Sequence, residues 1–240
     1  MGMPITVEIL DPSINDSVFT DIYTYFSYVD HKYSTYKKDS EISQINRGLP
    51  ETEWSQEMTT VLQLCEQTKQ ETEGYFNIFH NGQRDPSGLV KGWAIQNAAN
   101  ILLDHHISNF CLEAGGDIQV HGLNDQGTTW RIGIRNPFDL TEVVKVVTTA
   151  SGGVATSGTY IRGQHIYNPH HPGALIEGIV SLTVIGPSIY EADRFATAAF
   201  AMGKSGIEFL ESLRGYEGYM IDSARQATLT SGFEKYVVVA

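Results

Sequence analysis

Residues 181–203 read SLTVIGPSIYEADRFATAAFAMG, and this stretch decides the fold that we expect. The β-branched run TVI predicts a buried strand, and the GPS that follows predicts its end. The alanine-rich segment after Glu191 predicts a helix. We therefore expect a strand, a tight turn and a helix at the centre of the protein.

Asp193 and Thr197 stand four residues apart in the expected helix. That spacing places a carboxylate and a hydroxyl on one helix face, near the positive N-terminal end where phosphates and their metal ions collect. The pair is thus a candidate half-site for a hard cation. An ordinary first-turn acidic residue and a packed threonine would give the same spacing, so spacing alone leaves both interpretations open.

The segments on either side separate helices from strands. Helical periodicity dominates residues 16–110 and 190–213, whereas residues 111–186 hold four or five expected strands and no long helix. This segregation predicts an α+β fold with mixed or antiparallel sheets flanked by helices. No repeat of 20–50 residues and no low-complexity linker is present, so we expect one domain over residues 1–240.

One expected strand, FCLEAGGDIQVHG from residue 110, carries a glycine pair. Gly115 and Gly116 inside a strand pattern indicate a bulge or the close passage of the backbone beside another group.

Composition narrows the class of function. The 240 residues are 41% apolar, enough for a substantial core, and 16 basic against 28 acidic residues give a formal charge of −12. That charge argues against a nucleic-acid binder and against docking on an anionic membrane. A phosphorylated ligand would need a metal ion, backbone N–H groups or a placed cation such as Lys91. Cys65 and Cys111 have neither disulfide-framework nor zinc-site spacing.

The chain begins MGMPITVEIL, without a basic segment or an apolar stretch typical of a leader. We expect no export signal and no membrane anchor, and a cytoplasmic location if Met1 is the natural start. An exported form whose leader has been removed would have the same sequence.

Several polar and aromatic residues are further candidates. Tyr36 is followed by two lysines, so its ring could stack on a ligand ring while the lysines attract a phosphate. A solvated loop with a packed tyrosine would have the same sequence. His165 suits a general base at neutral pH, though a histidine bonded to backbone is equally compatible. With His170 and His171 it also suggests a transition-metal site, whose geometry is poor on a proline-flanked turn. No P-loop or Rossmann glycine motif is present.

Nine segments in order resemble the FAD:protein FMN transferases, the ApbE-like family formerly called thiamine-biosynthesis lipoproteins. The resemblance covers nearly the whole chain, and its order is more specific than any one segment. The segments are Met1-Gly2, STYKKDSEISQIN (34–46), GYFN (74–77), DPSGLVKGWAIQ (85–96), AGGDIQVHG (114–122), WRIGIRNP (130–137), TSGTY (156–160), HIYNPHHPG (165–173) and residues 181–203.

The resemblance implies a set of site residues. It implies a Mg²⁺ ion held by Asp193, Thr197 and the Gly88 carbonyl, and His165 as the base. It implies that FAD is the substrate and is contacted by Met1, Tyr36, Tyr75, Phe76, Asn77, Asp85, Lys91, Ile166 and Tyr167.

The reaction implied is attack by a Ser or Thr hydroxyl of a target protein on the FMN-side phosphorus of FAD, with release of AMP. A FAD pyrophosphatase, with water as the acceptor, and a non-catalytic flavin-binding protein are the alternatives. Three departures from the family pattern bear on this choice. Asn77 and Asn168 stand where the family has Asp, and Glu113 stands where it has Asn. Each Asp→Asn change removes a charge and keeps an acceptor, and a lost carboxylate near His165 would lower its basicity.

Overall fold

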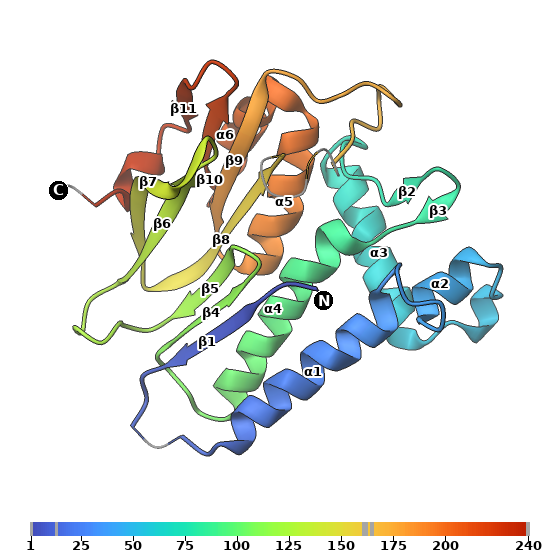
Figure 1. Ribbon diagram of the computed structural model, residues 1–240, viewed down its shortest axis with the longest axis horizontal. Helices are drawn as coiled ribbons and strands as arrows, with labels where there is room; N and C mark the ends of the chain where they lie inside the picture. Colours follow the sequence, from blue (N-terminus) through green and yellow to red (C-terminus); the bar gives the residue numbers. More distant parts are fainter. Residues whose placement is uncertain (1, 13, 160–162, 164–165, 239–240) are drawn as a thin grey trace.

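A seven-stranded antiparallel sheet runs through the middle of the protein (Figure 1). The computed structural model describes residues 2–12, 14–159, 163 and 166–238. Every strand pairing among these residues is antiparallel. In spatial order the strands are β1 (Ile5–Ile9), β4 (Phe110–Ala114), β5 (Asp117–His121), β8 (Ser151–Gly158), β9 (Ile179–Gly186), β10 (Glu217–Asp222) and β11 (Ala227–Leu229).

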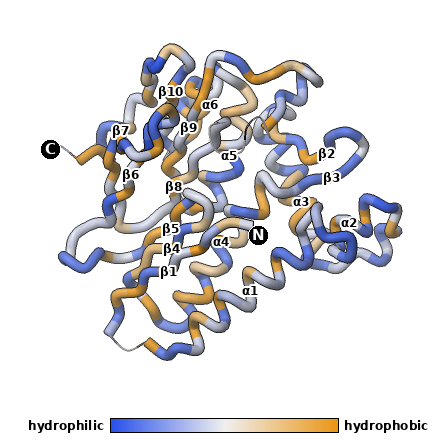
Figure 2. Tube along the Cα trace, viewed as in Figure 1, coloured by the Kyte–Doolittle hydropathy of each residue, from blue (hydrophilic) through white to orange (hydrophobic). Residues whose placement is uncertain are grey.

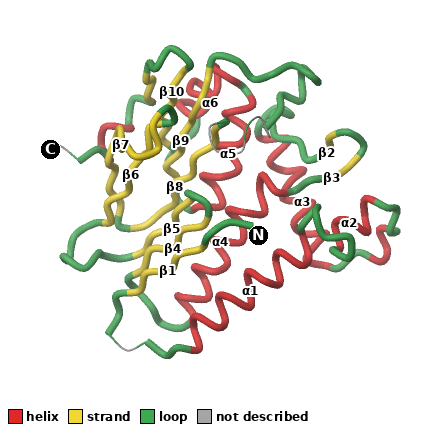
Figure 3. Tube along the Cα trace, viewed as in Figure 1, coloured by secondary structure: helices red, strands yellow, loops and turns green. Residues whose placement is uncertain are grey.

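The helices lie together on one side of this sheet (Figure 3). The helix α5 packs on β8 and β9, α4 packs on α5 and on β4 and β5, and α1 packs on α4. The apolar residues between these helices and the sheet form the larger core. The helices are α1 (Ser17–Tyr33), α2 (Glu41–Asn46), α3 (Gln56–Glu71), α4 (Ser87–Asp104), α5 (Ile189–Ala201) and α6 (Gly206–Ser212), with 3₁₀ turns at Glu51–Glu53, Gly203–Ser205 and Phe233–Tyr236.

A long hairpin covers the opposite face of the sheet. Its strands are β6 (Trp130–Asn136) and β7 (Asp139–Thr149), and β6 alternates between buried and exposed residues. Its buried side chains form a second core with sheet residues such as Val154 and Ile185, next to Ala155 and Val184 of the larger core. Successive strand residues point to opposite faces, so the sheet is buried on both sides here.

The predicted strand, turn and helix of residues 181–203 are confirmed as β9 and α5. Seven of the eight β9 residues are buried, as expected for a strand covered on both faces. Ser188 ends the turn and caps α5 by accepting the Glu191 N–H at 3.4 Å. The α+β class is therefore confirmed, whereas the absence of an internal domain boundary stays a prediction.

Of the two interpretations of Gly115 and Gly116, the bulge was wrong, whereas the backbone does pass close to another group, because a Cβ atom on Gly115 would lie 2.8 Å from Met3 Sδ. Ala114 of β4 pairs with Asp117 of β5, so the two glycines form a two-residue hairpin turn. Their φ angles are +60° and +94°, which only glycine adopts readily and which a tight hairpin requires. The single expected strand is two strands, and residues 110–186 hold six strands in place of four or five.

The helix boundaries follow the local signals of the sequence. Ser40, a residue type favoured at helix N-caps, accepts the Ser43 N–H at 3.2 Å. Glu73 and Gly74 follow α3 with positive φ, as is common where helices end. A small hairpin of β2 (Phe79–His80) and β3 (Gln83–Arg84) follows, and Figure 2 shows its hydrophilic tip. Among the described residues, no helix has the length and apolarity needed to span a bilayer.

Candidate active site

The candidate site lies where α4 and α5 come into close contact. A Cβ atom on Gly92 of α4 would lie 2.6 Å from the Asp193 Cβ and 2.7 Å from the Ile189 carbonyl oxygen. Only a glycine at position 92 permits this approach. The Gly92 N–H donates to Asp193 Oδ2 at 2.7 Å, so the same close contact fixes the carboxylate.

One lysine stands between two buried carboxylates. Lys91 Nζ lies 2.5 Å from Asp117 Oδ2 and 3.4 Å from Asp193 Oδ1. The two aspartate side chains are 1% and 3% exposed, whereas the lysine side chain is 20% exposed. Asp117 Oδ1 accepts the Thr156 N–H at 3.1 Å, which ties α4 and α5 to β5 and β8.

The charges of this cluster do not balance. Burial raises the pKa of the Asp193 carboxyl above its ordinary value, the nearby Lys91 lowers it, and Asp117 raises it again. Two buried carboxylates share one ammonium group, so full ionisation leaves a negative charge shielded from water. A cation bound beside Asp193 would compensate that charge.

Thr197 and Gly88 meet one helical turn further along the same contact. Thr197 Oγ1 donates to the Gly88 carbonyl at 3.3 Å, and a Cβ atom on Gly88 would lie 3.2 Å from Thr197 Cγ2. The carbonyl oxygen has two lone pairs and can accept from more than one group. The three residues that resemblance assigns to the metal are therefore close together, paired as Gly88 with Thr197 and Gly92 with Asp193.

The chemistry of these groups fits a hard cation. A carboxylate, a hydroxyl and a backbone carbonyl are oxygen ligands, which Mg²⁺ prefers, and Mg²⁺ commonly completes its shell with substrate phosphates. No group of three or more His, Cys, Asp or Glu residues in the described part of the chain has metal-binding geometry. A histidine-based transition-metal site accordingly has no support from His170, whose Nε2 lies 2.9 Å from the Glu73 carbonyl oxygen.

Aromatic side chains gather next to the metal candidates. The Phe76 ring is buried, and a Cβ atom on Gly88 would lie 3.4 Å from it. Tyr75 lies 4.3 Å from the His170 ring, centroid to centroid. Tyr167 donates to the Asn77 carbonyl and stacks on His80 with the centroids 3.9 Å apart. Residues 75–77 and Tyr167 therefore lie close together, and their contact with flavin stays a prediction.

The side chains of two candidates bond to local backbone. Asn77 Oδ1 accepts the Phe79 N–H at 2.9 Å, and Asp85 Oδ1 accepts the Ser87 N–H at 3.0 Å at the start of α4. An asparagine can make this turn as well as an aspartate, so the Asn77 departure leaves the local fold intact.

The remaining candidates are more scattered. Tyr36 is 97% exposed in the turn between α1 and α2, and Ile166 packs against the larger core. Met1 and His165 lie outside the described residues, so their predicted roles stay predictions.

Two residues of the site were not anticipated. Asp117 is a buried acidic residue inside a strand, an unusual choice that follows the glycine pair and signals a specific partner. Gly92 lies inside a helix, where a glycine lowers helix stability by about 1 kcal/mol relative to alanine. A glycine at such a position indicates that another element packs closely against the helix. Lys91 pairs with Asp117 and Asp193 in this structure, and its predicted contact with flavin stays a prediction.

The fold and the oxygen-lined helix contact define an α+β protein with a candidate metal-dependent site. The ApbE family model matches residues 1–82 and 79–220, nearly the whole sequence. The chain belongs to the ApbE family.

Curated relatives give the same family. A FAD:protein FMN transferase of Vibrio cholerae is 34% identical over 129 residues, which are 50% of this chain and 39% of that protein. One from Escherichia coli K12 is 30% identical over 146 residues, which are 57% of this chain and 42% of that protein. The matched region therefore spans about two fifths of the length of these relatives.

Solved structures share the fold over a longer span. The flavin transferase ApbE from Vibrio cholerae superposes with a TM-score of 0.86 at 24% identity, covering 98% of this chain and 96% of that one. The ApbE protein from Thermotoga maritima gives a TM-score of 0.88 at 21% identity, covering 99% and 97%. At this identity the likeness establishes the fold.

Proposed function

We propose that the protein is a Mg²⁺-dependent FAD:protein FMN transferase that moves FMN from FAD to a Ser or Thr hydroxyl of a target protein and releases AMP. Family membership and the names of the curated relatives support the reaction class. The observation that carries the proposal is the α4–α5 contact, where Asp193, Thr197 and the Gly88 carbonyl offer oxygen ligands beside an uncompensated buried carboxylate.

In this proposal Asp193, Thr197 and the Gly88 carbonyl hold the Mg²⁺ ion. The ion would neutralise negative charge on the FAD pyrophosphate, which a chain of net charge −12 cannot otherwise accept readily. Lys91 adds a second positive charge on the same side. The flavin and adenosine contacts are proposed at Met1, Tyr36, Tyr75, Phe76, Asn77, Asp85, Lys91, Ile166 and Tyr167.

The transfer is a substitution at phosphorus. The acceptor hydroxyl oxygen forms a bond to the FMN-side phosphorus, and the bond from this phosphorus to the bridging oxygen breaks. AMP leaves with the bridging oxygen, and FMN stays on the acceptor as a phosphodiester. The hydroxyl proton goes to His165, proposed as the general base, because a neutral imidazole accepts a proton near pH 7. Positioning and charge neutralisation supply most of such a rate enhancement.

The test mixes the protein with FAD, Mg²⁺ and a separately expressed acceptor domain that carries one Ser or Thr target. Covalent flavin fluorescence on the acceptor domain in a denaturing gel, and a mass increase of one FMN, are the expected results. Asp193→Asn should lower the transfer rate by about 100-fold or more, the typical effect of removing one electrostatic stabiliser of a transition state. EDTA should have a similar effect.

Asp222→Asn is the matched control, because Asp222 is also a buried aspartate paired with a lysine, Lys204, but lies on β10 outside the site. Transfer that is undiminished in Asp193→Asn and in EDTA would refute the metal role. Release of FMN and AMP without any acceptor would favour the pyrophosphatase, and tight FAD binding without turnover would favour the flavin-binding protein.

A further inference from the structure

The strand β1 forms one edge of the seven-stranded sheet, and its outer backbone groups have no partner among the described residues. The Gly115 N–H donates to the Pro4 carbonyl, and the Leu10 N–H donates to the Asn109 carbonyl. In an antiparallel pair, residues that bond to the neighbouring strand alternate with residues whose N–H and C=O point away. The N–H and C=O groups of Ile5, Val7 and Ile9 therefore point to the open edge.

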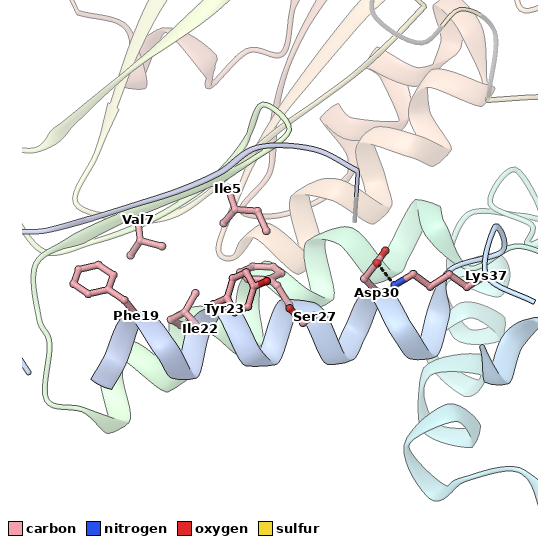
Figure 4. A pocket seen from close by; sticks show the side chains of 9 residues that line it. Ile5, Val7, Phe19, Ile22, Tyr23, Ser27, Asp30 and Lys37 are labelled. Carbon is pink, nitrogen blue, oxygen red and sulfur yellow. Dashed lines mark ion pairs between the residues drawn. The ribbon is translucent and has the colours of Figure 1, made fainter. Parts of the chain in front are cut away.

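An apolar groove of about 520 Å³ lies between this strand and α1. Figure 4 shows the side chains of Ile5 and Val7 pointing from β1 toward Phe19, Ile22 and Tyr23 of α1. The Phe19 and Tyr23 side chains are 42% and 74% exposed. A strand added at the open edge would place every second side chain over this groove, because strand side chains alternate between faces.

The groove leads toward the candidate active site. Its far end is closed by Asp30 and Lys37, whose charged groups are 2.5 Å apart, and Lys37 follows Tyr36, a proposed flavin contact. At the same end of β1, Met3 packs against Gly115, two residues before Asp117. A segment bound along β1, whichever way its chain runs, would therefore have one end near Met3, close to Asp117, and near Lys37, next to Tyr36.

We infer that the open edge of β1 and the groove beside α1 bind an extended segment of the flavin-acceptor protein by strand addition, with apolar residues at alternate positions. This inference rests on the proposed function and names the surface that the acceptor would use. The unpaired N–H and C=O groups select an extended peptide over a helix, and the apolar groove selects apolar alternate side chains.

A second copy of this chain is a less suitable occupant. The five residues of β1 span roughly 17 Å at about 3.3 Å each, so strand pairing along this edge alone would bury less than the roughly 1,200–2,000 Å² typical of a stable interface. Two chains that each carry a charge of −12 would also repel each other. A short edge suits transient binding of a substrate protein, which must leave after transfer.

Hydrogen exchange gives a direct test that requires no transfer. The probe is the same acceptor domain with its target Ser or Thr replaced by Ala, added at saturating concentration to the full-length protein. The amides of Ile5, Val7 and Ile9 should exchange at least about tenfold more slowly in the complex, whereas those of Thr6 and Glu8, already bonded to β4, should change little. Unchanged exchange at Ile5, Val7 and Ile9 in the complex would overturn the inference.

A kinetic test uses proline. Val7→Pro removes an N–H that points to the open edge and leaves the β1–β4 hydrogen bonds intact, and proline is tolerated on edge strands. It should raise the KM for the acceptor domain by about tenfold relative to Val7→Ala, because one strand-to-strand hydrogen bond is lost and the next strand cannot approach. The kcat and the affinity for FAD should stay unchanged.

Tyr23→Ser should also raise this KM, and Leu140→Ser is the matched control, since Leu140 is exposed on β7 outside the groove. Equal KM values for Val7→Pro and Val7→Ala would overturn the inference. Protection of residues 5–9 that rises with the concentration of this protein alone, and is indifferent to the acceptor domain, would overturn it in favour of a second copy. A wild-type protein that modifies no acceptor but binds the probe at β1 would refute the transferase and leave the docking surface standing.

Discussion

Asp193 and Arg194 are neighbours on α5, yet their side chains point in different directions and belong to two different charge clusters. Asp193 faces Lys91 and Asp117, and both aspartates are almost fully buried. The Arg194 guanidinium bonds to Glu71, and its Nε donates to Glu191 Oε2 at 2.8 Å. Those two glutamate side chains are 36% and 24% exposed.

Each cluster holds two carboxylates and one cation, so exposure decides how they differ. Water screens the excess negative charge of the glutamates, and Tyr216 donates to Glu191 as well, at 2.9 Å. The excess charge beside Asp193 has no such access to water. The excess charge of the Arg194 cluster is therefore screened by water, whereas that of the Asp193 cluster is not, and it is the Asp193 cluster that we propose to bind a cation.

Among the variants that test this difference between the clusters, Gly92→Ala should have the largest effect on stability and activity. The new Cβ atom would clash with Asp193 and with the Ile189 backbone. We expect the free energy of unfolding to fall by about 2–3 kcal/mol, the upper part of the range for overpacking, with loss of transfer activity. Gly88→Ala meets side chains at longer range, the Thr197 methyl group at 3.2 Å and the Phe76 ring at 3.4 Å, and should cost clearly less. Urea unfolding of both variants checks this, and equal costs would contradict the helix contact as described.

Arg194→Met should lower the free energy of unfolding by about 2 kcal/mol, since it removes charge-assisted hydrogen bonds to Glu71 and Glu191. The partial exposure of the glutamates keeps the loss below that of a fully buried pair. Transfer per folded molecule should be retained. Arg214→Met, at an exposed position, is the control and should be nearly neutral. A variant that stays stable but loses transfer would move Arg194 into the active site.

The smallest expected effect is on the pH dependence of folding stability, to which the two clusters should contribute with opposite signs. Burial, reinforced by Asp117 and opposed by Lys91, raises the pKa of Asp193, so its contribution to stability is present below about pH 4 and is lost as the pH rises through the raised pKa. Burial also acts to raise the pKa of Glu71, but bonds from Arg194 and Gln67 lower it. Its contribution is present above about pH 4.3 and is lost as the pH falls.

Urea unfolding in EDTA across this range checks the signs. Asp193→Asn should flatten the loss of stability toward high pH, and Glu71→Gln should flatten the loss toward low pH. The same sign in both variants would remove the distinction between the clusters.

Local patterns predicted the elements that depend on local physics. The β-branched run and the alanine-rich segment gave β9 and α5, and the i,i+4 spacing put Asp193 and Thr197 on one face toward α4. Serine caps such as Ser40 were equally visible, because a cap bonds to backbone within the next turn.

Contacts between distant segments were not predictable in the same way. The glycine pair at 115 and 116 fits a bulge or a turn equally well, and only the pairing of Ala114 with Asp117 decides. The partnership of Lys91 with Asp117 depends on two elements that meet through the sheet. Whether β1 lies at the edge of the sheet depends on how many strands pair with it, and the pattern of residues 5–9 does not predict that number.

The adjacency of Asp193 and Arg194 has a consequence for how this helix can change in evolution. Consecutive helix residues point about 100° apart. Inserting or deleting one residue early in α5 would rotate Asp193, Arg194 and the buried residues that follow by about 100° about the helix axis, so both charged groups would leave their partners. Insertions and deletions should therefore be excluded from residues 189–201, even where individual substitutions are accepted.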